Sequence, residues 1–153
     1  MIEVRALQSD DWQLWRQLRL AALTDAPWAF GSTLAEWSDA GDTEARWRSR
    51  FDNVPYNAVI SLDGTPAGMV GAYPSDTEPG TVELISMWVA PFGRGKGVSD
   101  AAIRAVLDWA DPRPVILSVK ADNKAAIRLY ERNGFTDAGP SPDDDDERLM
   151  RRP

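Results

Sequence analysis

The sequence contains no cysteine and no histidine. The absence of cysteine excludes disulfide bonds, thiolate nucleophiles and zinc–thiolate sites. The absence of histidine removes the most common general base and the most common side-chain ligand of transition metals. We therefore expect no metal site, and any acid–base chemistry has to use Asp, Glu, Tyr, Lys or a positioned water.

The chain also lacks long apolar runs and an excess of positive charge. No segment approaches the length of a transmembrane helix, and residues 1–5 lead into an amphipathic segment rather than a signal peptide. The net charge of −7 argues against a nucleic-acid partner, because such proteins usually present clustered Lys and Arg to phosphate. The expected location is the cytoplasm, with neither a membrane nor a nucleic acid as partner.

The length of 153 residues, with 43% apolar and 27% charged residues, predicts one globular domain over residues 1–153. Hydrophobic periodicity and turn residues predict the elements in chain order. They are strand 2–7, a helix from Ser9 or Asp10 to about Asp25, helix 43–53, strands 56–62, 67–73 and 81–89, helix 99–110, strand 115–119, helix 123–133, strand 135–138 and a final edge strand 147–152. This order indicates a mixed α/β (α+β) domain, in which strands 81–89 and 115–119 are parallel.

A glycine-rich turn between strand 81–89 and helix 99–110 is the first candidate binding site. Glycines at 93, 95 and 97 allow the backbone to approach a ligand, and the unpaired N–H groups and dipole of the helix favour an anion. Arg94 and Lys96 add positive charge in an acidic chain. The pattern indicates a pyrophosphate site; the alternative is a glycine-rich turn with two solvated basic side chains.

Two other phosphate-binding motifs do not fit this turn. A dinucleotide-binding fingerprint needs glycine at 98 or 100, where Val98 and Asp100 stand. A Walker A loop needs Ser or Thr after Gly-Lys, but Gly97 follows Lys96. A nucleotide- or dinucleotide-binding domain is therefore disfavoured.

The turn Arg94-Gly95-Lys96-Gly97-Val98-Ser99 resembles the acetyl-CoA signature of the GNAT acetyltransferase superfamily. Ser99 departs from the Gly or Ala that is usual at the last position, but it is small and favourable at a helix start. The segment Asn123–Phe135 resembles the second hallmark, in which an Asn opens a helix, a Tyr lies two turns on, and Gly-Phe ends it. The resemblance covers at least residues 82–135, and the preceding order of elements, including residues 29–33, is also similar.

The resemblance implies a GNAT-like fold, with a central twisted mixed sheet of about six or seven strands flanked by four helices. It implies acetyl-CoA as cofactor and CoA as product, with Asn123 on the pantetheine arm and Tyr130 near the sulfur as general acid. In the family, the strand with Met87, Trp88 and Val89 splays away from its parallel neighbour, so that its backbone would pair with pantetheine and one N–H would polarise the thioester carbonyl. The alternative is that Asn123 is only an N-cap and Tyr130 only a core aromatic.

Attack on a thioester requires a neutral amine, so a base has to remove a proton from the acceptor. Glu83 is the best candidate in the central region, at a position where several GNAT members carry a glutamate that acts through water. The alternative is that Glu83 faces solvent or forms an ion pair. Glu36, Asp39 and the C-terminal acids remain rivals.

In the family, the acceptor lies between the connection of the first two helices and the loop between the last two strands. Here these segments contain the aromatic residues Trp28, Phe30 and Trp37 and the acidic run that includes Asp143 and Asp144. They predict a cationic small-molecule amine, polyamine-like or aminoglycoside-like, because aromatic faces and acids attract cations. Core tryptophans and a solvated acidic loop are the alternative.

These observations predict an N-acetyltransferase that transfers the acetyl group of acetyl-CoA to a primary amine by direct attack in a ternary complex. A transferase acting on a protein N-terminus or lysine is one alternative. A non-catalytic acyl-CoA-binding regulatory module is another. An exposed terminal strand would allow a homodimer.

Overall fold

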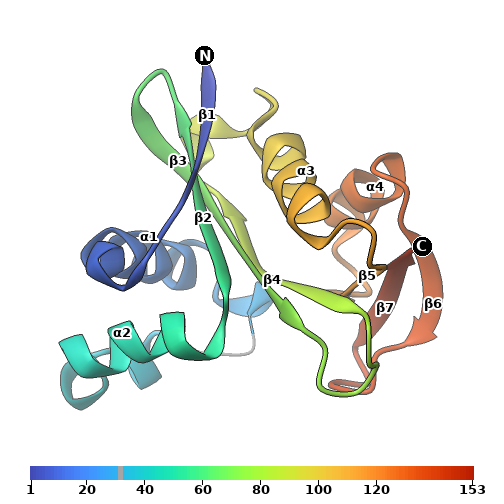
Figure 1. The fold of residues 1–153 in the computed structure, drawn as a ribbon, viewed down its shortest axis with the longest axis horizontal. Helices are drawn as coiled ribbons and strands as arrows, with labels where there is room; N and C mark the ends of the chain where they lie inside the picture. Colours follow the sequence, from blue (N-terminus) through green and yellow to red (C-terminus); the bar gives the residue numbers. More distant parts are fainter. Residues whose placement is uncertain (31–32) are drawn as a thin grey trace.

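The computed structural model describes residues 1–30 and 33–153, which form seven β-strands and four α-helices (Figure 1). The helices are α1 (Trp12–Asp25), α2 (Glu44–Asn53), α3 (Val98–Ala110) and α4 (Lys124–Arg132). The strands are β1 (Ile2–Ala6), β2 (Tyr56–Leu62), β3 (Thr65–Pro74), β4 (Val82–Val89), β5 (Val115–Lys120), β6 (Thr136–Pro140) and β7 (Glu147–Arg152). The predicted mixed sheet with four helices is confirmed.

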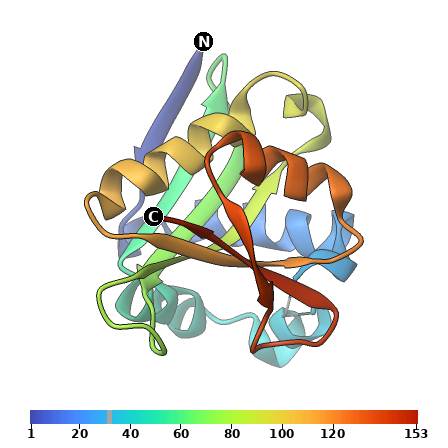
Figure 2. The ribbon, with the colours of Figure 1, turned by 90° about the vertical axis from the view of Figure 1, so that its right-hand side faces the viewer.

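All seven strands form one sheet in the order β1-β2-β3-β4-β5-β7-β6. The β4–β5 pair is parallel, and the other pairs are antiparallel. Helices α1 and α2 cover one face of the sheet, and α3 and α4 cover the other (Figures 1 and 2). Two apolar clusters result, one around Trp15 and Trp47 and one around Ile103 and Phe135. The sheet therefore separates two apolar clusters, one on each of its faces.

The start of the first helix differs from the prediction. Ser9 and Asp10 lie in a 3₁₀ turn that spans Ser9–Asp11, and α1 begins at Trp12. Gln8 and Asp11 form the capping box of this turn, and the Asp11 carboxylate accepts a hydrogen bond from the Gln8 N–H at 2.9 Å. The prediction of Ser9 or Asp10 as N-cap was wrong because the tight turn takes up both residues before the α-helix starts.

The last strand is not an edge strand. β7 lies between β5 and β6 and is antiparallel to both, and the side chain of Met150 at its centre is buried. The β6–β7 hairpin returns the chain into the gap beside β5, which gives β7 backbone partners on both sides. The edges of the sheet are β1 and β6.

In the described part of the chain, no helix combines the length and apolar character needed to cross a bilayer. The segment 29–33, which contributed to the family resemblance, includes Gly31 and Ser32, which lie outside the described residues. Of its described members, Ala29 ends the 3₁₀ turn Pro27–Ala29 and Phe30 is the C-cap of that turn, while the Thr33 hydroxyl accepts a hydrogen bond from the Glu36 N–H at 3.3 Å.

Candidate active site

The parallel strands β4 and β5 separate after their first two residue pairs. Val82 pairs with Val115 and Glu83 with Ile116, and within the described chain no further β4–β5 pairs follow. Beyond this point β4 also carries a bulge, where Ser86 has a φ of 57°. The edge of β4 from Leu84 to Val89 is therefore open toward β5, so its backbone groups are available to a ligand.

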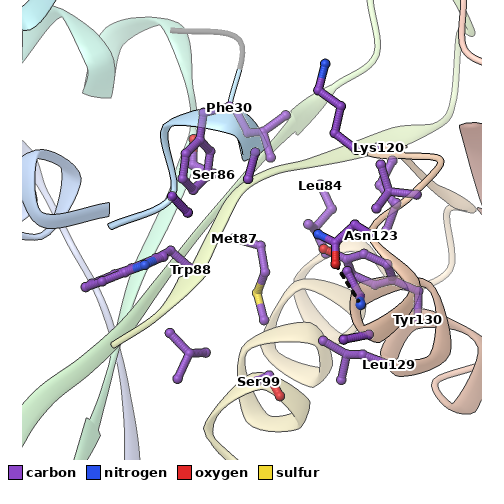
Figure 3. A pocket seen from close by; sticks show the side chains of 18 of the residues that line it. Phe30, Leu84, Ser86, Met87, Trp88, Ser99, Lys120, Asn123, Leu129 and Tyr130 are labelled. Atoms are coloured by element: carbon purple, nitrogen blue, oxygen red, sulfur yellow. Dashed lines mark hydrogen bonds between the residues drawn. The ribbon is translucent and has the colours of Figure 1, made fainter. Parts of the chain in front are cut away.

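A cavity of about 550 Å³ occupies this opening, a volume typical of small-molecule sites. It is lined by residues from β4, β5, the start of α3, α4 and the segment after α1. Ten of the predicted site residues line it: Trp28, Phe30, Met87, Trp88, Val89, Arg94, Gly95, Ser99, Asn123 and Tyr130. Figure 3 shows Met87 projecting between Phe30 and Ser86 on one side and Asn123 and Tyr130 on the other.

The glycine-rich turn places the start of α3 at one end of the cavity. Gly95 and Gly97 have φ values of 73° and 89°, which a residue with a side chain rarely adopts. Gly97 is the N-cap of α3 and provides no side-chain cap, so the first N–H groups of the helix remain open to an anion. Lys96, Gly97 and Val98 do not line the cavity, and the side chain of Val98 is buried in the core.

Arg94 is engaged within the protein. Its guanidinium forms an ion pair with Asp25 and donates from Nε to the Val89 carbonyl at 3.1 Å. Asp25 also accepts from Trp88 Nε1 at 3.0 Å, and the hydrogen bonds from Trp88 and Arg94 lower the pKa of Asp25. A phosphate near Arg94 would therefore compete with Asp25 for the guanidinium.

Asn123 and Tyr130 each make structural contacts within the protein and also line the cavity. The side chain of Asn123 caps α4 by accepting a hydrogen bond from the Ala126 N–H at 3.2 Å. Tyr130 is 7% exposed and packs edge-to-face on Phe135, with ring centroids 5.8 Å apart. Burial raises the pKa of Tyr130 to about 12, so the phenol keeps its proton at neutral pH.

Glu83 lies at the point where β4 and β5 separate. Its carboxylate accepts a hydrogen bond from the Tyr73 hydroxyl at 3.3 Å. Burial raises the pKa of Glu83 and the nearby charge of Asp143 raises it further, while the Tyr73 hydrogen bond lowers it. The side chain does not line the cavity, although the next residue, Leu84, does.

The acidic loop between β6 and β7 lies beside the cavity but is partly neutralised. Asp144 forms an ion pair with Lys120 at 3.2 Å, and Lys120 lines the cavity. Asp143 accepts a hydrogen bond from the Ser118 hydroxyl at 3.3 Å. Trp37 does not line the cavity and packs on Trp47, with ring centroids 4.5 Å apart.

The cavity also contains polar residues that the sequence reasoning missed, among them Asp25, Ser86, Lys120 and Arg132. Lys120 gives a weak signal, as a charged residue that ends a buried strand. Ser86 gives none, because the bulge that turns it depends on the pairing of β4 with β3.

One cavity thus combines a parted parallel strand pair, a helix N-terminus and a buried tyrosine. The family model of the "Acetyltransferase (GNAT) family" matches residues 12–135. The chain therefore belongs to the GNAT acetyltransferase family.

Proteins of known name share parts of the sequence or the whole fold. The mycothiol acetyltransferase of Mycobacterium avium is 29% identical over 133 residues, which are 76% of this chain and 42% of the relative. The human N-acetylaspartate synthetase is 41% identical over 86 residues, 54% of this chain and 28% of that protein. The chain thus spans less than half the length of either relative.

The PaiA N-acetyltransferase of Thermoplasma acidophilum, whose structure was solved with coenzyme A, superimposes with a TM-score of 0.74. Its sequence is 15% identical, and the match covers 99% of this chain and 98% of that one. The fold of the whole chain is therefore that of a GNAT acetyltransferase.

Proposed function

We propose that the protein transfers the acetyl group of acetyl-CoA to the primary amine of a small molecule, by direct attack in a ternary complex. The observation that carries the proposal is the cavity in the β4–β5 opening. It connects the anion-binding start of α3 with Tyr130, and its lining includes Leu84, the residue next to Glu83.

The residues present fit acetyl-CoA as a substrate. The N–H groups at the start of α3, beside Gly95, hold the pyrophosphate, and Arg94 joins them by exchanging Asp25 for phosphate. The open edge of β4 at Met87–Val89 pairs with the amides of the pantetheine arm. Asn123, whose oxygen is used by the cap, offers its amide N–H₂ to the same arm.

In the acetyl transfer, the acceptor arrives as an ammonium ion and loses one proton, through a water, to Glu83. The neutral nitrogen attacks the thioester carbon, the new C–N bond forms, and the C–S bond breaks. A backbone N–H of β4 stabilises the oxyanion during this step. A raised pKa makes Glu83 a stronger base than an exposed glutamate.

Tyr130 stabilises the departing sulfur mainly as a hydrogen-bond donor. The pKa of its phenol is about 12, whereas an alkyl thiol has a pKa of about 8.5. Complete transfer of the phenol proton to the thiolate would therefore cost about 5 kcal/mol. The thiolate takes its final proton from the attacking nitrogen, which becomes acidic once it is bonded to the acetyl carbon.

The acceptor is a small molecule that carries a positive ammonium group. Trp28 and Phe30 provide aromatic faces in the cavity, and Asp143 places a negative charge near Glu83. Both relatives described above are named for small-molecule products or substrates. An acceptor at a protein N-terminus or lysine is the alternative.

The test is a thiol-release assay with acetyl-CoA and three acceptor sets: small amines, basic peptides and acidic peptides. We expect turnover with a small amine, and a fall in kcat of about 10²-fold in Tyr130→Phe and in Glu83→Gln. CoA binding, measured by calorimetry, should persist in both variants. Asp143→Asn combined with Asp144→Asn should raise the acceptor KM at low salt.

Turnover with peptides alone would identify a protein acetyltransferase instead. Tight CoA binding without thiol release from any acceptor would identify a regulatory module. Rates near that of the wild type in both Tyr130→Phe and Glu83→Gln would refute the catalytic roles.

A further inference from the structure

Arg19 is a buried cation on the apolar face of α1. It lies one helical turn from both Trp15 and Leu23 and is 7% exposed. Its guanidinium packs over the ring of Phe30 at 4.7 Å from the centroid. The Nη1 atom is buried and has no hydrogen-bond partner among the described residues. A buried charged donor without a partner is costly, so its presence calls for a ligand.

Arg50 of α2 is a second cation on the same side of the sheet, with neutral partners. Its Nε donates to Asn57 Oδ1 at 2.9 Å and its Nη2 to Ser86 Oγ at 3.1 Å. Its guanidinium also packs over the ring of Trp15, 4.7 Å from the centroid. These contacts orient the charge but leave it uncompensated.

The charges of Arg19 and Arg50 contrast with those of other arginines in the chain. Seven arginines form ion pairs with carboxylates: Arg5, Arg16, Arg48, Arg94, Arg132, Arg148 and Arg151. Within residues 1–30 and 33–153, Arg19 and Arg50 form none, and the same holds for five arginines that are partly or fully exposed: Arg46, Arg104, Arg113, Arg128 and Arg152. Arg19 differs from all of these because its side chain is far more deeply buried. If Arg19 had only a structural role, we would expect it to form an ion pair, because buried charges are normally paired.

The two guanidinium groups are also close enough to repel each other. Burial lowers the pKa of Arg19 to about 10. It lowers the pKa of Arg50 to about 9, and the positive charge of Arg19 contributes to that fall. Both groups remain charged at neutral pH. One anion between them would compensate both charges.

Both arginines contact residues that line the cavity. Phe30 covers Arg19, and Ser86 accepts a hydrogen bond from Arg50; Figure 3 shows Phe30 and Ser86 on the side opposite Asn123 and Tyr130. The positive φ of Ser86 is a strained conformation that belongs to the β4 bulge. Gly71 of β3 leaves the space for Arg50, because a Cβ there would collide with Nη2.

Charges of both signs lie just behind residues that line the cavity, with Arg19 behind Phe30, Arg50 behind Ser86 and Glu83 next to Leu84, although none of the three lines it directly. Asp143 and Glu83 suit the ammonium group, and the Tyr73 hydroxyl, which donates to Glu83, also lies near the Arg50 guanidinium. We infer that the acceptor is an amine that also carries a carboxylate, and that Arg19 and Arg50 bind this carboxylate while the amine faces Glu83. This inference rests on the proposed acetyl transfer for the role of the amine, but the anion site stands on the arginines alone.

The test compares each amino acid with its own amide, which keeps the amine and removes the negative charge. The acceptors are glycine, β-alanine and 4-aminobutyrate, each beside its carboxamide, so that three separations between the two groups are covered. We expect the wild type to prefer the acid over the amide at one separation by at least about tenfold in kcat/KM. Arg19→Met and Arg50→Gln should each reduce that preference about 10- to 100-fold, as expected for a lost charge-assisted hydrogen bond.

Two further variants separate this role from a purely structural one. Arg50→Lys keeps the positive charge and should retain part of the preference, whereas Arg104→Gln, at an exposed position of α3, should retain all of it. Calorimetric titration of the same acids without acetyl-CoA adds a measurement that does not require turnover. Binding should weaken in Arg19→Met and Arg50→Gln.

The outcomes distinguish this inference from the proposed function. Acid binding that is lost in the arginine variants, without thiol release from any amine, would support the anion site and refute the acetyl transfer. Turnover of amines with no preference for any acid over its amide, and no acid binding, would overturn the inference and leave the acetyl transfer intact. A preference that both arginine variants preserve would also overturn it.

Discussion

Replacing Arg19 by methionine should make the unliganded protein more stable. The side chain is 7% exposed, and burial lowers the pKa of its guanidinium to about 10. Because the folded pKa lies below the unfolded value, the charged group destabilises the fold at every pH below about 10. The penalty is relieved only as the pH rises through that value.

The magnitude follows from the same pKa. A fall to about 10 from the ordinary value corresponds to about 3 kcal/mol of lost stability at pH 7. The contact with Phe30 returns about 1 kcal/mol of this. Methionine keeps the apolar stem of the side chain without the charge, so we expect Arg19→Met to raise the free energy of unfolding by about 1–3 kcal/mol.

Urea unfolding at pH 7 measures this difference by linear extrapolation. Arg104→Met, at an exposed position of α3, is the matched control and should change the stability by less than about 0.5 kcal/mol. A loss of stability of 1 kcal/mol or more in Arg19→Met, with an unchanged m-value, would refute the reasoning. It would show that the guanidinium is compensated inside the protein and needs no ligand.

Two further predictions concern the cofactor turn and the base. Gly95→Ala and Gly80→Ala should each lower the free energy of unfolding by about 1 kcal/mol, because both glycines have positive φ and open space around the missing Cβ. Only Gly95→Ala should weaken CoA binding in calorimetry. Equal CoA affinities of the two variants would exclude the turn from the site. The pKa of Glu83 is raised, and the base form exists above that pKa, so kcat/KM should fall as the pH falls through it. Glu83→Gln should remove this acid limb from the pH profile, and a limb that persists with the same midpoint would assign it to another group.

Local sequence was sufficient for the elements that we propose as the cofactor site. Gly95 and Gly97 predict a left-handed turn, and Asn123 at the start of a helical segment predicts a cap, because both features depend on a few neighbouring residues. The helix periodicity likewise places Tyr130 within two turns of that cap. Local sequence predicted the wrong start for α1, because a 3₁₀ turn and an α-helix begin with the same kinds of residue.

The point at which β4 and β5 separate, and the order of the strands beside them, could be known only from the tertiary structure. The residues alone predict that β4 and β5 are parallel, and only the family resemblance implies that they splay apart. The structure gives the point of separation, after Glu83, and the insertion of β7 beside β5 reverses the expected edge. Strand partners are chosen by the packing of the whole sheet, which a local pattern does not contain.

The sequence by itself thus determined the family, the left-handed conformation of the glycine-rich turn, and a chemistry restricted to carboxylates, phenols and amines by the absence of histidine and cysteine. The tertiary structure decided which charged side chains lie behind Phe30 and Ser86, across the cavity from Asn123 and Tyr130. Arg19 and Arg50 belong to different helices, and each looks like an ordinary helical arginine in the sequence. Only the packing of α1 and α2 against β3 and β4 buries Arg19 and brings its charge near that of Arg50, because burial and mutual repulsion are properties of the folded chain.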